Sequence, residues 1–188
     1  MKILLTLFVL LFSSSVVAED ISDFEIEGMS IGDSLLDYFS EEEIINASYN
    51  YYKYITPKKF YQINLYKHNN FRMYDGVLVS LLLSDNDYII YSLDGYIYLK
   101  DNENCNQKIQ SISLEMAKVF NKAKKVVQEV RSHPEDPSGK STSWGNAFFL
   151  GSKEGNASVR CYLWSDKMPY DDNFRVSIRT AEYNKWLY

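Results

Sequence analysis

The residues of this chain whose types could do chemistry gather in one loop, residues 133–142. The loop contains His133, Asp136 and Ser141, which supply the imidazole, carboxylate and hydroxyl that a serine hydrolase brings together. Nearness in sequence does not establish the geometry that this chemistry needs. A small periplasmic hydrolase centred on this loop is therefore kept as an alternative function, behind a binding role.

The end of the same loop favours anion binding. Gly139, Lys140, Ser141 and Thr142 offer backbone N–H groups, a cation and two hydroxyls. The run looks like the end of a phosphate-binding P-loop, but that motif requires a glycine where this chain has Pro134. A structural interpretation stays open, in which the prolines stop the preceding helix and Gly139 turns the chain. The predicted binding residues are His133, Asp136, Gly139, Lys140, Ser141 and Thr142.

The rest of the chain offers little for catalysis. It has two histidines, His68 and His133, and no His-Glu-x-x-His or paired Cys-x-x-Cys spacing. We therefore predict no metal site, no cofactor and no catalytic residues. In an exported chain the two cysteines, Cys105 and Cys161, are most simply interpreted as a disulfide, which leaves no free thiol for nucleophilic chemistry.

The first residues predict export. Lys2 gives a positive start, residues 3–12 are almost all apolar, and Val16 and Ala18 suit a small-residue cleavage site. We expect a signal peptide at 1–18, a single domain at 19–188 and a periplasmic location. The apolar run is about half of the roughly twenty residues that span a membrane, and no cysteine follows the cleavage site. No stable membrane anchor is expected after cleavage.

Charge and composition narrow the class of partner. The formal net charge is −5, without a block of lysines and arginines. Nucleic acids and anionic membranes reward clustered positive charge, so neither is an expected partner. The dense tyrosines of residues 49–54 have rings that could stack on sugars. The candidate partners are a periplasmic protein, a glycan or a small anion.

The elements that flank the loop must position it. Residues 105–130 carry apolar side chains at steps of three or four, which predicts one long amphipathic helix: Ile109, Ile112, Met116, Val119, Ala123, Val126 and Val130. Strand-like alternation marks the segments 60–66, 77–83, 88–93, 96–99, 144–150, 157–164 and 174–178. We predict an α+β fold, in which an antiparallel sheet of about six to eight strands packs against one long helix. Residues 34–39 and those after Thr180 add a short helix near each end.

The alternation also assigns two faces to the last strands. Val159, Cys161 and Leu163 share one face, while Arg160, Arg175 and Arg179 point the other way. The apolar face should meet the long helix, where Cys161 can reach Cys105. The arginine face should be open to solvent or to a partner.

Three stretches resemble a family of small exported proteins of uncharacterised function from marine alphaproteobacteria. They are residues 26–40, which run from Ile26-Glu27-Gly28-Met29-Ser30 to Ser40, the loop 136–142, and residues 161–165 with 175–178. The resemblance covers nearly the whole chain after residue 18. It implies a bacterial, periplasmic setting and brings no activity and no catalytic residues. The opening is also similar, more weakly, to that of small outer-membrane-assembly lipoproteins of the BamE kind.

The sequence thus favours a non-catalytic exported binding or interaction module over the hydrolase. The preference depends more on the scarcity of catalytic motifs than on a recognised site. The ligand, the oligomeric state and the biological process have no signature in the sequence.

Overall fold

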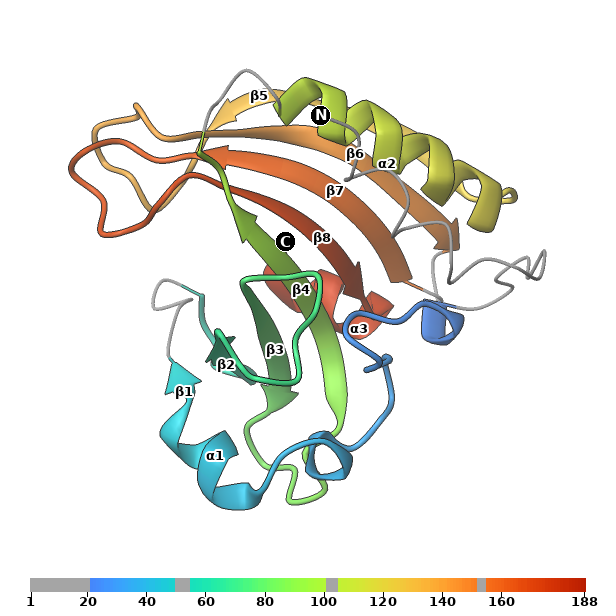
Figure 1. The fold of residues 1–188 in the computed structure, drawn as a ribbon, viewed down its shortest axis with the longest axis vertical. Coiled ribbons are helices and arrows are strands. Elements are labelled where there is room, and N and C mark those ends of the chain that lie inside the picture. Colours follow the sequence, from blue (N-terminus) through green and yellow to red (C-terminus); the bar gives the residue numbers. More distant parts are fainter. Residues whose placement is uncertain (1–20, 50–54, 101–104, 152–154) are drawn as a thin grey trace.

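The fold is dominated by one antiparallel sheet. The computed structural model describes residues 21–49, 55–100, 105–151 and 155–188. Eight strands pair in the order β1-β2-β3-β4-β8-β7-β6-β5 (Figure 1). They are β1 (Ser48–Tyr49), β2 (Phe60–Tyr66), β3 (Gly76–Leu82), β4 (Ile90–Tyr98), β5 (Lys124–Ser132), β6 (Thr142–Gly151), β7 (Gly155–Leu163) and β8 (Asn173–Arg179).

The helices are short and few among the described residues. They are α1 (Glu41–Asn46), α2 (Cys105–Val119) and α3 (Ala181–Leu187), with 3-10 turns at Ile21–Asp23 and Leu35–Asp37. The predicted signal peptide, 1–18, lies outside the described residues, as do residues 50–54 of the tyrosine-rich stretch.

The predicted sheet packed against one long helix is wrong. Helix α2 has 15 residues and ends at Val119, and residues 124–130, predicted as helix, belong to the edge strand β5. Helix α2 packs on β6 and β7, at one end of the sheet (Figure 1). The chain is mostly sheet, so the α+β description fits it only in part.

Strand β5 contains a β-bulge. Strand β5 pairs with β6 through Gln128 opposite Gly145 and Arg131 opposite Ser143, with a register shift between the two pairs. Gly145 and Ser143 are two positions apart and share a face of β6. Gln128 and Arg131, three positions apart, therefore also share a face. The misleading apolar pair in this strand is Val126 and Val130, which lie four positions apart, an even spacing that is as typical of a strand as of a helix.

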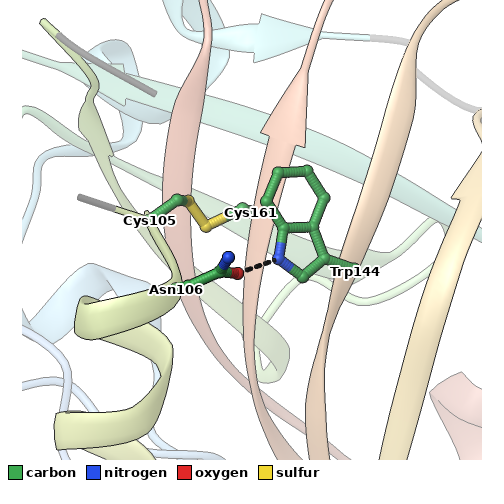
Figure 2. The surroundings of a disulfide bond; sticks show 4 residues. All are labelled: Cys105, Asn106, Trp144 and Cys161. Atoms are coloured by element: carbon green, nitrogen blue, oxygen red, sulfur yellow. Dashed lines mark hydrogen bonds between the residues drawn. A yellow bond between two sulfur atoms is a disulfide. The ribbon is translucent and has the colours of Figure 1, made fainter. Parts of the chain in front are cut away.

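The predicted disulfide is present. Cys105 at the start of α2 is bonded to Cys161 on β7, with the two Cα atoms 6.2 Å apart (Figure 2). Beside it, the indole N–H of Trp144 on β6 donates to the side-chain oxygen of Asn106 over 2.8 Å (Figure 2). The first turn of α2 is thereby held to two neighbouring strands.

Helix α2 covers the apolar face of the sheet. Ile109 and Met116 are buried there with Val159 and Cys161 of β7. A polar contact also crosses this interface, because the Asn146 amide donates to the Ser113 hydroxyl over 2.7 Å. The opposite face of β7 and β8 carries Arg160, Arg175 and Arg179.

No helix of the described ranges is long and apolar enough to cross a membrane. The disulfide is compatible with an oxidising compartment such as the periplasm. Export itself stays a prediction from residues 1–18.

Replacing both Cys105 and Cys161 with serine should lower the free energy of unfolding by about 2 to 4 kcal/mol. The bond closes a loop of 56 residues, and opening it releases entropy in the unfolded chain. Urea unfolding of the oxidised protein and the double variant measures the difference. Reduction of the wild type should reproduce the loss, and equal stability of the oxidised protein and the variant would contradict it.

Candidate functional site

A cavity lies on the face of the sheet opposite α2. Its volume is about 300 Å³, and its lining includes four arginines, namely Arg131, Arg160, Arg175 and Arg179. They come from β5, β7 and β8. The three arginines that the alternation placed on one face therefore meet at a single cavity, together with a fourth.

The lining of the cavity is rich in arginine and contains no lysine among the described residues. The chain has five arginines, and four of them line this cavity. The arginine that lies elsewhere is Arg72, which is exposed in the loop after β2. Guanidinium groups have a planar fork of N–H donors that matches carboxylate and phosphate oxygens, which the ammonium group of lysine lacks.

The bulge in β5 completes the cavity. It places Arg131 on the same face as Gln128, and both residues line the cavity. In an unbroken strand the two would lie on opposite faces. Sequence reasoning missed Arg131 for this reason, and because the residues before it, up to Val130, were predicted to be helical.

A glycine makes room beside Arg160. Gly145 lies opposite Arg160 on β6, and a Cβ atom at this position would come within 2.9 Å of the Arg160 Cγ. Any larger side chain would also meet the backbone of β7. The absence of a side chain at residue 145 therefore leaves the space that the Arg160 side chain occupies beside β6.

Arg175 is held in place from two sides. It lies directly across from Arg160 in the β7–β8 pairing. Its Nε donates to the side-chain oxygen of Asn173 over 2.8 Å, and its guanidinium lies 4.5 Å from the centre of the Tyr162 ring. An arginine ordered in this way loses less conformational entropy when it binds a ligand.

Arg179 forms the deepest part of the charged wall. It is 4% exposed and donates to the Asp94 carboxylate of β4 over 2.8 Å, while the hydroxyl of Ser177 also donates to Asp94. Burial alone would raise the pKa of Asp94, but Arg179 and Arg175 outweigh it and lower the pKa. Asp94 is therefore ionised and fixes Arg179.

The loop 133–142 is built around the carboxylate of Asp136. Ser138 donates to Oδ1 through its N–H (2.8 Å) and its hydroxyl (2.6 Å). Ser141 donates to Oδ2 in the same two ways, over 2.8 and 2.7 Å, and the Ser165 hydroxyl adds a fifth bond of 2.8 Å. These bonds hold the pKa of Asp136 well below its usual range, and the side-chain bonds from Ser138 and Ser141 have the largest effect.

Three of the four N–H groups predicted to receive an anion, those of Gly139, Lys140 and Ser141, are thus engaged within the loop. The Ser141 N–H donates to Asp136 Oδ2, and the Gly139 N–H donates to the Asp136 carbonyl over 3.0 Å. The Lys140 N–H donates to the Ser138 hydroxyl over 3.4 Å. The carboxylate of Asp136 occupies the position that an external anion would take in such a nest.

His133 packs among aromatic rings. Its ring centre is 4.5 Å from that of Trp164 and 5.9 Å from that of Tyr162. Burial, Arg175 and Arg160 together lower its pKa to about 4, against the opposing effect of Asp136. His133 is therefore neutral at physiological pH.

The His133, Asp136 and Ser141 trio is not arranged as a catalytic relay. The Ser141 hydroxyl donates directly to Asp136 and accepts from the Ser165 N–H over 3.0 Å. Nδ1 of His133 accepts from the Glu135 N–H over 3.3 Å. The proton of the serine is therefore directed to the carboxylate, whereas nucleophilic catalysis needs it directed to the imidazole.

Of the six predicted binding residues, His133 lines the arginine cavity, as do its neighbours Ser132 and Pro134, and the other five do not. Asp136 and Ser141 are buried in the loop, Gly139 and Lys140 are exposed at its tip, and Thr142 begins β6. Within the described part of the chain, no group of three or more His, Cys, Asp or Glu side chains is placed to hold a metal ion.

No family model matches the sequence, and comparison with curated proteins and with solved structures gives no significant match. The site is therefore interpreted from its own geometry.

Replacing Asp136 with asparagine should lower the thermal midpoint by several degrees. One of the two oxygens becomes an NH₂ group, which would face N–H and O–H donors that now lack an acceptor. Differential scanning calorimetry measures the midpoint. Asp166→Asn, an exposed change in the neighbouring turn, is the control, and equal midpoints for the two variants would show that the Asp136 network does not stabilise the loop.

The stability of the protein should rise with pH between about 4 and 6.5, in part through His133. The unfolded chain binds a proton at His133 in this range and the folded chain does not, because the folded pKa is about 4 against an ordinary 6.5. Unfolding midpoints across this range should show a shallower slope for His133→Gln. NMR titration of the imidazole checks the cause, and titration near pH 6.5 would refute it.

Proposed function

We propose that the protein is an exported, non-catalytic binding module that takes a small anion in the arginine cavity. The observation that carries the proposal is the convergence of four of the five arginines on one cavity of about 300 Å³. The disulfide and the predicted signal peptide support the periplasm as its compartment.

The electrostatics of the site support this function. Like charges brought together in a partly buried cavity repel one another, and an anion relieves that repulsion. Arg175 and Arg179 are already ordered by Asn173, Tyr162 and Asp94, so binding would cost little side-chain entropy at these positions. Ordered guanidinium groups also form strong, charge-assisted hydrogen bonds to oxyanions.

The hydrolase alternative has weaker support. It needs an imidazole that takes the proton of a nucleophile, and His133 is packed against Trp164 with its Nδ1 engaged by the loop backbone. The Ser141 hydroxyl donates to Asp136 instead. Both functions would use His133, and in the binding module it forms part of the cavity wall.

Replacing Arg160 with glutamine should weaken binding of inorganic phosphate by about 10- to 100-fold, because a hydrogen bond to a charged group contributes about 1.5 to 3 kcal/mol. Isothermal titration calorimetry on the oxidised protein at low salt measures the affinity. Acetate, sulfate and glucose complete the panel, with glucose as the uncharged ligand.

The matched control is Arg72→Gln, which removes the same charge from an exposed position outside the cavity lining. It should bind as the wild type does. The thermal midpoint of each variant shows that it is folded. Equal losses in the two variants, or no binding of any anion to the wild type, would overturn the proposal.

A further inference from the structure

We infer that the natural ligand is a phosphate monoester of a hydroxylated molecule about the size of a sugar. This inference rests on the proposed anion-binding function and specifies the ligand of the same cavity. Three features of the lining carry it: its charge, its volume and its hydrogen-bond acceptors.

The charge of the wall favours a doubly charged group. Four guanidinium groups line the cavity, and the carboxylates that accompany them are Glu129 in the lining and Asp94 behind Arg179. Among these side chains the positive charges exceed the negative ones by two, and the Tyr188 hydroxyl hydrogen-bonds to Arg160 and Arg179. His133 adds no charge near neutral pH, because its pKa is about 4. A phosphate monoester carries nearly two negative charges at neutral pH, whereas a carboxylate or a sulfate ester carries one.

The volume favours more than a bare ion. A water molecule takes about 30 Å³, and a five-atom oxyanion is only a few times larger. The cavity holds about 300 Å³, which lies at the lower end of the range for small-molecule sites. After a phosphate has bound, space is left for a group of about the size of one sugar ring.

The acceptors favour hydroxyl groups on that ring. Gln128 lines the cavity, and its side-chain oxygen is buried without a hydrogen-bond partner among the described residues. A small rotation of the amide would let this oxygen accept from a ligand hydroxyl. The Glu129 carboxylate and the Ser143 hydroxyl, also in the lining, add acceptors that an apolar ligand would leave unmatched.

The experiment compares glucose 6-phosphate with glucose 6-sulfate by isothermal titration calorimetry. The two esters have nearly the same shape and differ by one charge at neutral pH. Glucose 6-phosphate should bind at least tenfold more tightly at pH 7. At pH 5, below the second phosphate pKa of about 6, its affinity should fall about tenfold.

The sulfate ester controls for changes in the protein. Its charge is constant between pH 5 and pH 7, so a change in the protein over this range would alter the binding of both esters. Equal affinity for the two esters at pH 7 would overturn the inference of a dianion. If the two esters bind equally and Arg160→Gln loses both, the inference of a dianion fails but the proposed anion-binding function stands.

The hydroxyl contacts have a separate test. Gln128→Leu should weaken glucose 6-phosphate about tenfold and leave inorganic phosphate unchanged. The control is Gln110→Leu, since Gln110 is an exposed residue of α2 that does not line this cavity. Inorganic phosphate binding as tightly as the sugar ester would overturn the inference of a sugar-sized ligand. Failure of every anion to bind would overturn the proposed function as well.

Discussion

The buried ion pair between Asp94 and Arg179 joins the two halves of the molecule. The first half of the chain forms β1 to β4, the second half forms β5 to β7, and the last strand, β8, lies between β4 and β7. Asp94 on β4 and Arg179 on β8 are 1% and 5% exposed at their side chains and 2.8 Å apart. Leaving one such charge without its partner costs about 3 to 5 kcal/mol, so the pair strongly favours this strand order. Because Arg179 also lines the cavity, the contact that joins the halves also supports the proposed site.

The sequence was informative wherever a pattern had one structural cause. The alternation in β7 and β8 correctly separated the α2 face from the arginine face, and an even cysteine count correctly paired Cys105 with Cys161. The helix prediction failed because apolar steps of three or four had two causes. Up to Val119 they belong to a helix, whereas Val126 and Val130 belong to strand β5, and in a regular strand a step of four also returns to the same face. Only the pairing with β6 distinguishes the two.

The candidate site shows the limit of local reasoning more sharply. The loop 133–142 attracted attention because its polar residues are close in sequence, yet their hydrogen bonds are made mostly to one another around Asp136. The arginines are spread from residue 131 to residue 179, and sheet pairing brings them together. Their shared face was visible in the alternation, whereas the cavity also depends on the bulge in β5 and on the end of α3 with Tyr188. Neither has a sequence pattern that marks it as part of a site.

The contrast between the whole chain and the cavity bears on which anions can bind. The chain has a formal net charge of −5, while the wall of the cavity is positive. Charges on the surface are screened within about 8 to 10 Å at physiological salt. A long polyanion such as a nucleic acid would lie against the acidic exterior over most of its length, and it releases few counterions unless positive charges are spread along its path. A small anion that enters the cavity meets guanidinium groups at close range. The same charge distribution therefore disfavours polyanions and favours a compact ligand, which agrees with the proposed binding of a small phosphate ester.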